Sequence, residues 1–286
     1  MSRVSQISLR ILVLFPMFCS CQNVKNKSVF LNSDMYDLAN PKVLKLAPEL
    51  DEISGLAYYS KDTSVFAIID EDGILYKIPL NHPDQFREWT FDKKRDYEDV
   101  VLRDSVFYVL VSNGDIVTIN FNGDKPTAFK TEFPGASKKI NEFEALYNDA
   151  GKIIIVCKSC EADEAGIASS YLYNPLDSVN VYSNYKQFDL LSVLDEKERK
   201  GKHAKISAAA IHPVTGELYL LSSIHHLLVI ADKNGRVRKS FKLDPSLYNQ
   251  AEGIAFTPTG DLVISNEKGA TANATLLLMK NKLNKQ

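Results

Sequence analysis

Short apolar runs alternate with short polar breaks along most of this chain. Beyond residue 36, runs rich in Val, Ile, Leu, Tyr and Phe are interrupted every few residues by turn-forming sequences such as NG, DG, TG and DAG. Runs of this kind, bounded by Gly, Asn and Asp, are typical of β-strands joined by tight turns. The pattern predicts an all-β protein.

One phrase recurs five times where these strand pairs begin. The copies read EISGLAYYS, DYEDVVLRD, NEFEALYND, KISAAAIHPVTG and QAEGIAFTPTG, and their equivalent positions, called the anchors below, are Ser54, Glu98, Glu144, Ser207 and Glu252. Successive anchors lie 44, 46, 63 and 45 residues apart. A period near 45 residues is that of a four-stranded propeller blade. We therefore predict a five-bladed β-propeller with four-stranded blades.

The propeller is expected over residues 37–286, with an insertion at about 175–203 that we expect to include a short helix. Only 34 residues follow Glu252, too few for a whole blade. Residues 37–50 are therefore expected to supply an outer strand, so that N- and C-terminal segments close the ring. A β-sandwich has a similar number of strands, but it does not require a phrase that recurs every 45 residues.

The N-terminus has a different pattern. Arg3 and Arg10 precede a short apolar stretch, residues 11–18, and the sequence FCSC ends there. This resembles a secretory signal with a bacterial lipobox, and the stretch is too short to span a bilayer. We expect a lipoprotein signal peptide and lipobox over 1–21, lipidation of Cys21, and a polar spacer over 22–36. The mature protein would be attached by lipid to the cell envelope, facing the bacterial periplasm or on the outer membrane. An uncleaved secretory signal with incidental cysteines is the alternative.

Composition excludes little else. The chain has 286 residues, of which 45% are hydrophobic, and a formal net charge of −2. This charge gives no whole-chain attraction for nucleic acid, so we expect no nucleic-acid partner. We also expect a monomer. The CKSC sequence, Cys157 to Cys160, could be a disulfide, a redox pair or half of a metal site. A second CxxC is missing, which argues against zinc and favours a structural or surface pair.

The five phrases, in this order and spacing, resemble the SdiA-regulated family of bacterial propellers over about residues 41–280. The segments that carry the resemblance are DEISGLAY, DYEDVV, EFEALY, KISAAAIHPVTGELYLLSS and QAEGIAFTPTGDLVISNE. The resemblance implies a five-bladed propeller distantly related to NHL-repeat proteins, often an envelope lipoprotein, with a calcium site. The family has no settled reaction. Ser54 and Ser207 depart from a fully acidic ring.

The anchors are expected to meet at one mouth of the central channel, because the innermost strand of each blade runs along it. Glu98, Glu144 and Glu252 are the candidate metal ligands, since three converging carboxylates repel unless protons or a cation offset them. Oxygen donors without imidazole or thiolate favour calcium as the cofactor. With Ser54 and Ser207, the ends of the second strands would form a polar ring at this mouth: Asp70, Glu71, Asn113, Lys158, Ser223, Asn266 and Glu267.

Two functions fit this arrangement. The first is an envelope-anchored calcium-binding propeller that presents its mouth to a small-molecule or protein ligand. The second is a calcium-dependent hydrolase of phosphoesters, esters or lactones, similar to phytase-like or lactonase-like propellers, with Lys158 as the candidate catalytic residue. The sequence has no GxSxG, HExxH, P-loop or Rossmann motif. The binding module is therefore favoured over the enzyme.

Overall fold

The computed structural model describes residues 33–136, 140–177, 181–195 and 203–284. The expected signal peptide and lipobox over 1–21, with Cys21, lie outside these residues, as does most of the expected spacer. Within the described ranges, no helix combines the length and the apolar character needed to cross a membrane.

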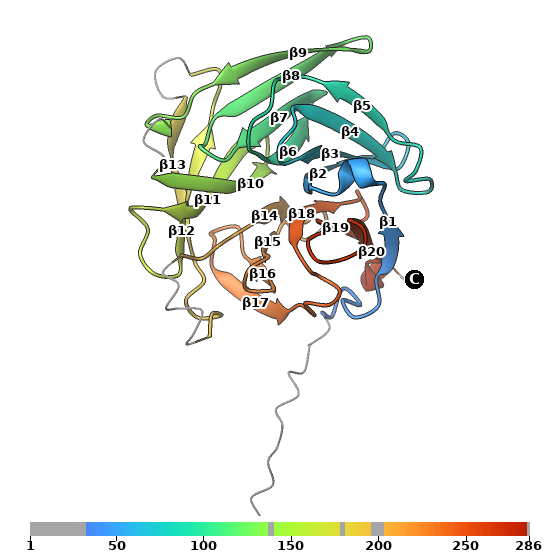
Figure 1. Cartoon of the computed structure of the whole chain (residues 1–286). Coiled ribbons are helices and arrows are strands. Elements are labelled where there is room, and N and C mark those ends of the chain that lie inside the picture. Colours follow the sequence, from blue (N-terminus) through green and yellow to red (C-terminus); the bar gives the residue numbers. More distant parts are fainter. Residues whose placement is uncertain (1–32, 137–139, 178–180, 196–202, 285–286) are drawn as a thin grey trace, which may run out of the picture.

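Five antiparallel sheets of four strands each surround a common centre, as predicted (Figure 1). The first blade consists of β2 (Ile53–Tyr59), β3 (Ser64–Ile69), β4 (Ile74–Pro79) and β5 (Arg87–Thr90). The second consists of β6 (Tyr97–Arg103), β7 (Val106–Val111), β8 (Ile116–Asn122) and β9 (Lys125–Thr131). The third consists of β10 (Asn141–Asp149), β11 (Lys152–Cys160), β12 (Ile167–Tyr173) and β13 (Tyr182–Asp189). The fourth consists of β14 (Ala208–Ile211), β15 (Leu218–Ser222), β16 (Leu227–Ala231) and β17 (Val237–Lys242). The fifth consists of β18 (Ala251–Phe256), β19 (Leu262–Asn266), β20 (Thr275–Met279) and β1 (Lys42–Lys45).

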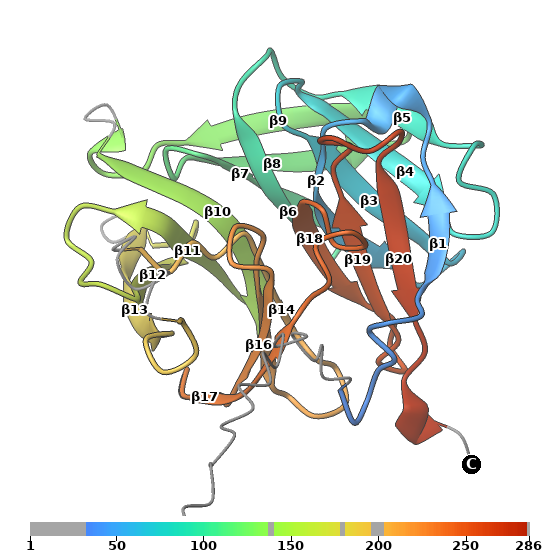
Figure 2. The same ribbon diagram turned by 60° about the horizontal axis from the view of Figure 1, so that its bottom comes forward.

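The first strand of each blade, β2, β6, β10, β14 or β18, is innermost, and these five strands contact one another in a closed ring (Figure 2). Two short 3₁₀ segments, Pro48–Leu50 and Lys282–Asn284, are the helical elements in the described residues. The inner strands therefore carry the anchors to the centre of the molecule.

The hydrophobic core lies between the blades. Along β3, Val65, Ala67 and Ile69 pack toward the fifth blade, whereas Phe66 and Ile68 pack toward the second. Successive side chains of a strand point to opposite faces, and both faces of an inner blade strand are covered by a neighbouring blade. This explains why the second strands read as continuous apolar runs and not as alternating ones.

The ring closes through the N-terminal segment, as expected. β1 pairs antiparallel with β20, from Lys42 opposite Leu278 to Lys45 opposite Thr275, and thus forms the outer strand of the fifth blade. Two tyrosines also hold the N-terminal segment against the fifth blade. Tyr36 Oη donates to the Gly260 carbonyl at 2.5 Å, and Tyr248 Oη donates to the Leu38 carbonyl at 2.8 Å. The first and last described segments are thereby joined within one blade.

The insertion in the third interval differs from expectation in its described part. Its residues 182–189 form β13, the outer strand of the third blade, and the expected short helix is not present between 181 and 195. Phe188, Leu190 and Leu194 are buried between the third and fourth blades. The open edge of β12 offers a full set of backbone partners, so strand pairing with burial of Phe188 prevails over helix formation.

Candidate functional site

The anchors lie where the pairing of the inner strands becomes irregular. In β6, Tyr97 pairs with Val111 and Asp99 with Leu110, so that Glu98 is an extra residue without a partner in the ladder. The same shift occurs at Glu144 in β10 and at Glu252 in β18. In β2 the irregularity lies between Ile53 and Leu56 and includes Ser54. A β-bulge redirects a side chain out of the regular alternation, and here three blades use one to turn a carboxylate toward the axis.

A cavity of about 310 Å³ opens at this end of the axis. Seven carboxyl groups and one ammonium group are among the described residues that line it. The lining consists of Ser54, Asp70, Asp96, Glu98, Ser112, Glu142, Glu144, Lys158, Gln250, Glu252 and Glu267. We call this cavity the acidic mouth.

Two glycines allow the inner strands to approach each other beside the bulges. A Cβ atom on Gly253 would overlap the Ser54 carbonyl oxygen and the Ser265 hydroxyl, and one on Gly55 would overlap the backbone and carboxylate of Asp99. Both positions therefore require glycine for steric reasons. Glu252 precedes Gly253 because the strand must place a carboxylate in the cavity and, one residue later, contact the next strand.

The two serine anchors do not act like the three glutamates. Ser54 Oγ donates to the Glu98 carbonyl at 2.6 Å, and Ser207 Oγ donates to the Ala251 carbonyl at 2.8 Å. Each bond joins the inner strand of one blade to that of the next. Ser207 is not among the residues that line the acidic mouth. Both hydroxyls thus contribute to the closure of the inner ring.

The expected polar ring is only partly assembled. Asp70, Lys158 and Glu267 line the acidic mouth, and the Ser223 hydroxyl hydrogen-bonds the Glu252 carboxylate from beside it. The other three members do not line the cavity. Glu71 is an exposed turn residue, Asn113 Oδ1 accepts the backbone N–H of Asp115 at 3.0 Å, and Asn266 Nδ2 donates to the Leu247 carbonyl at 3.2 Å.

The sequence reasoning missed three residues of the cavity wall with carboxyl or amide side chains: Asp96, Glu142 and Gln250. Each lies two positions before an anchor, at Glu98, Glu144 and Glu252. Residues two apart in an extended segment share a face, so this spacing was the signal that could have identified them. Gln250 also supports the wall, because its Nε2 donates to Glu267 Oε2 at 2.7 Å.

Crowding of carboxyl groups makes several of them hard to ionise. Burial, with repulsion from Asp96 and Asp70, raises the pKa of Glu98 to about 9. Burial and the adjacent Asp96 raise the pKa of Asp70 to about 7. Burial and the neighbouring carboxylates, Glu252 first, raise the pKa of Glu267 to about 8. The mouth therefore cannot keep all of its carboxyl groups ionised without a further cation.

Lys158 supplies the cation on one side of this mouth. Its ammonium forms an ion pair with Glu144, and its charge partly offsets the burial that raises the pKa values of Glu98, Glu252 and Glu267. In the β10–β11 ladder, Glu142 pairs with Ser159 and Phe143 with Cys157, so Lys158 is skipped. Glu144 and Lys158 thus project from facing irregularities and meet in the cavity.

A disulfide joins Cys157 and Cys160 on either side of this lysine. Both cysteines are buried in the core between the second and third blades. The CKSC sequence was expected to be a disulfide, a redox pair or half of a metal site, and the structure contains the disulfide. The two cysteines are buried, so the pair does not lie on the surface. Asp163 lies close enough to share a metal ion with two free thiolates, but sulfurs joined to each other are not thiolate ligands.

Another side of the mouth has the geometry for a metal ion. Carboxylate oxygens of Asp70, Asp96 and Glu98 lie within 4.8 Å of one another. Oxygens bound to the same Ca²⁺, each at about 2.4 Å, are at most about 5 Å apart, so the three groups fit one such ion. In addition, Asp70 Oδ1 is buried and accepts no hydrogen bond from the described residues. Of the three glutamates expected as ligands, only Glu98 belongs to this cluster.

The SdiA-regulated family matches residues 173–269. The match covers the outer part of the third blade, the whole fourth blade and the first two strands of the fifth, with Ser207 and Glu252. The resemblance to this family is confirmed for that segment. No curated protein sequence matches the chain.

Solved structures with the same fold cover nearly the whole propeller. The glutaminyl cyclase of Myxococcus xanthus is 14% identical, with a TM-score of 0.56, over 84% of this chain and 94% of that chain. Regucalcin of Agrobacterium tumefaciens, a calcium-binding protein, is 11% identical, with a TM-score of 0.50, over 88% and 96%. A luciferin-regenerating enzyme is 12% identical, with a TM-score of 0.50, over 85% and 96%. At these identities the similarity shows the propeller fold alone.

Proposed function

We propose that this protein is a calcium-binding propeller that serves as a ligand- or protein-binding module of the bacterial cell envelope. The observation that carries the proposal is the cluster of Asp70, Asp96 and Glu98, whose carboxylate oxygens lie within 4.8 Å of one another in an open cavity. The bound ion would offset the repulsion that raises the pKa values of Asp70 and Glu98.

The donor set favours a hard cation. Every acceptor at the cluster is a carboxylate oxygen, and such donors suit calcium, whereas zinc and copper favour nitrogen or sulfur ligands. Calcium would supply a fixed positive charge with coordination positions left for a ligand. The surrounding residues would hold the ion on one side, while Lys158 keeps Glu144 neutralised on the other. A partner bearing carboxylate or hydroxyl oxygens could then complete the coordination.

A hydrolase with the same ion is the second candidate, and it has weaker support. It requires a cation beside the metal that is able to bind the leaving anion, and Lys158 is engaged with Glu144. We expect no calcium-dependent turnover of phosphomonoesters, aryl esters or lactones above a heat-denatured control. Turnover that requires calcium and falls about tenfold in Lys158→Ala would show that the protein is a hydrolase and would overturn the binding-module proposal.

Attachment to the envelope is part of the proposal. It rests on the FCSC sequence at Cys21 and is consistent with the Cys157–Cys160 disulfide, since disulfides persist in oxidising compartments such as the periplasm. Expression of Cys21→Ala in a Gram-negative host should release the protein from the membrane fraction. A variant that stays as membrane-associated as the parent would refute lipid attachment.

Calcium binding is tested by thermal unfolding of the purified protein with and without calcium. A ligand that binds only the folded state stabilises it by about 2.7 kcal/mol at a hundred times its Kd. The increment should shrink in Asp96→Asn and persist in Asp84→Asn, a matched change at an exposed loop residue. Glu144→Gln distinguishes the cluster from the ligand set expected from sequence, because Glu144 belongs only to the latter. A calcium increment that shrinks in Glu144→Gln but not in Asp96→Asn would favour the set expected from sequence. If calcium raised the thermal stability of the parent and of Asp96→Asn equally, the cluster would not be the calcium site.

A further inference from the structure

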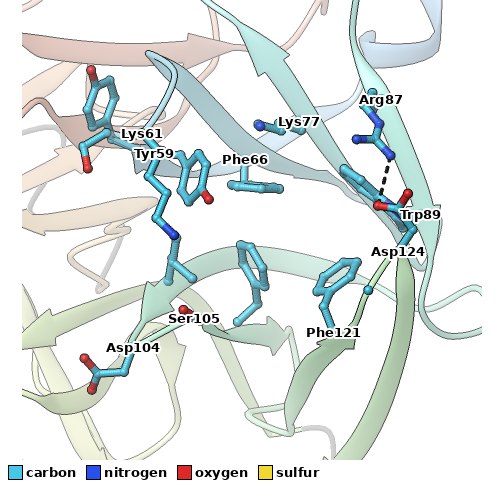
Figure 3. A pocket seen from close by; sticks show the side chains of 15 residues that line it. Tyr59, Lys61, Phe66, Lys77, Arg87, Trp89, Asp104, Ser105, Phe121 and Asp124 are labelled. Atoms are coloured by element: carbon cyan, nitrogen blue, oxygen red, sulfur yellow. Dashed lines mark hydrogen bonds and ion pairs between the residues drawn. The ribbon is translucent and has the colours of Figure 1, made fainter.

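A second cavity lies between the first and second blades, away from the acidic mouth. It has a volume of about 430 Å³, within the range of small-molecule sites, and shares no lining residue with the acidic mouth. Figure 3 shows its side chains, which come from strands and turns of both blades. We call it the aromatic groove.

Five aromatic rings form a continuous floor in this groove. Tyr59 contacts Phe66 at a centroid distance of 5.3 Å, and Phe66 contacts Phe107 at 4.6 Å. The row continues through Phe121, at 5.9 Å from Phe107, to Trp89, at 5.5 Å from Phe121. The rings meet edge to face, which leaves ring edges and faces directed at the cavity. Tyr59, Trp89 and Phe121 are only half-buried and can contact a ligand.

The two walls above this floor carry opposite charges. Lys61, Lys77 and Arg87 project from the first blade, and Asp104 and Asp124 belong to turns of the second. Arg87 lies 4.7 Å from the centroid of the Trp89 ring and pairs with Asp124 at 3.2 Å across the groove. Lys77 pairs with Asp62 and lies 4.9 Å from the Tyr59 ring. Figure 3 shows the Arg87–Asp124 bridge beside Trp89.

The turn that presents Asp104 has an uncommon backbone. Asp104 and Ser105 both have positive φ, at 50° and 68°, in the two-residue turn between β6 and β7. Turns of this type favour glycine, and a non-glycine residue in the left-handed region costs roughly 1 kcal/mol. The sequence places a carboxylate and a hydroxyl there instead. Both side chains line the groove, so the turn adds polar groups to it at some cost in stability.

We propose that the aromatic groove binds a neutral saccharide. A sugar ring has faces of weakly polarised C–H groups, which pack on aromatic rings because the ring face carries negative charge density. Its hydroxyl groups donate and accept hydrogen bonds, so they can use the carboxylates of one wall and the ammonium and guanidinium groups of the other. An anion or a cation would be attracted by one wall and repelled by the other. A fully apolar ligand would displace water from both charged walls without replacing the hydrogen bonds of that water.

The chain provides its own reporter, because Trp89 is its single tryptophan. The purified protein is titrated in chelator with glucose, galactose, mannose, N-acetylglucosamine and their disaccharides, while Trp89 emission is followed. We expect a saturable change with at least one sugar. Phe121→Ala and Asp124→Asn keep Trp89 and should each weaken binding by about tenfold. Asp84→Asn, outside the groove, is the matched control.

Circular dichroism spectra establish that each variant is folded, and calorimetry repeats the titration without the fluorescence signal. Unchanged Trp89 emission with every sugar, together with no heat of binding, would overturn the proposal. Saturation by benzoate or adenosine monophosphate, with no response to sugars, would also overturn it in favour of an aromatic anion. The chelator separates this test from calcium binding at the acidic mouth, so that either proposal can fail alone.

Discussion

The two ends of the central axis have opposite chemistry, although the inner strands β2, β6, β10 and β18 contribute residues to both. At the acidic mouth, the starts of the inner strands and the residues around them contribute seven carboxyl groups and one ammonium group. At the other end, a cavity of about 440 Å³ is lined by residues such as Ala57, Val101, Ala209, Ile254 and Pro258, with no charged residue among its described lining. We call this second end the apolar mouth.

The difference arises from strand pairing as much as from residue type. The second halves of β2, β6 and β18 pair regularly, and small apolar side chains face the axis there. The first halves contain the bulges at Ser54, Glu98 and Glu252. One extra residue in each strand thus directs a polar side chain toward the axis at one end, whereas regular pairing directs apolar side chains toward it at the other. The comparison shows that the carboxylates of the candidate metal site gather where the ladder is irregular.

The largest expected effect comes from removing the close approach that the bulges require. Gly253→Ala should destabilise the protein by about 3 kcal/mol, since its Cβ would overlap backbone and side-chain atoms of two neighbouring strands. Urea unfolding measures the loss. Gly123→Ala is the control, because nothing lies within 4 Å of its Cβ position and only its positive φ of 62° opposes alanine, at a cost of about 1 kcal/mol. Equal losses in both variants would contradict a steric role for Gly253.

A second, smaller effect is the pH dependence of the metal-free protein. The pKa values of Asp70, Glu267 and Glu98 are raised to about 7, 8 and 9, so the folded state holds protons that the unfolded state has released. The stabilisation from these protonated groups is complete below their ordinary values of 3.8 and 4.5, and is lost as pH rises through the folded-state values. The melting temperature in chelator should therefore fall between about pH 5 and pH 9.

Calcium and one substitution sharpen this prediction. Bound calcium stabilises the ionised carboxylates, so it should flatten the decline, and Glu98→Gln should flatten it without calcium because the amide does not titrate. A decline of the same slope in the parent and Glu98→Gln would show that the titrating groups lie elsewhere.

The smallest expected effect concerns Lys158, which neutralises part of the acidic mouth. Lys158→Ala should lower stability in chelator by about 1 kcal/mol, because Glu144 and its neighbours lose their ammonium partner. The same variant should bind calcium several-fold more tightly, since a competing cation has been removed. Lys152→Ala, at the opposite end of β11, is the matched control for a calorimetric titration. Tighter binding in both variants would indicate a general charge effect.

Sequence reasoning could predict the fold because every blade repeats the same signal. The phrases at Ser54, Glu98, Glu144, Ser207 and Glu252 gave the number of blades, and the short segment left after Glu252 indicated that residues 37–50 supply the closing strand. The residues of the candidate site were harder to predict from the sequence than the fold. The bulges are three-dimensional features of strand pairing, and no residue type encodes them alone. Asp96 and Glu142 were overlooked although the period of two along a strand would have placed them beside the anchors.

The roles of the remaining site residues depended on contacts between blades that sequence does not contain. Ser54 and Ser207 look like metal donors in a list of anchors, but their hydroxyls donate to the carbonyls of Glu98 and Ala251. Lys158 looks like a free helper for catalysis, but it is paired with Glu144. The Phe188 segment looked helical, but β12 presented an edge for it to pair with.

The most direct test of the account is a crystal structure of the protein grown with calcium. The account predicts one calcium ion in the acidic mouth, coordinated by Asp70, Asp96 and Glu98 at about 2.3–2.6 Å, with the Lys158–Glu144 ion pair intact. An acidic mouth that contains only water at saturating calcium, or an ion held by Glu144 and Glu252 with Lys158 displaced, would contradict it.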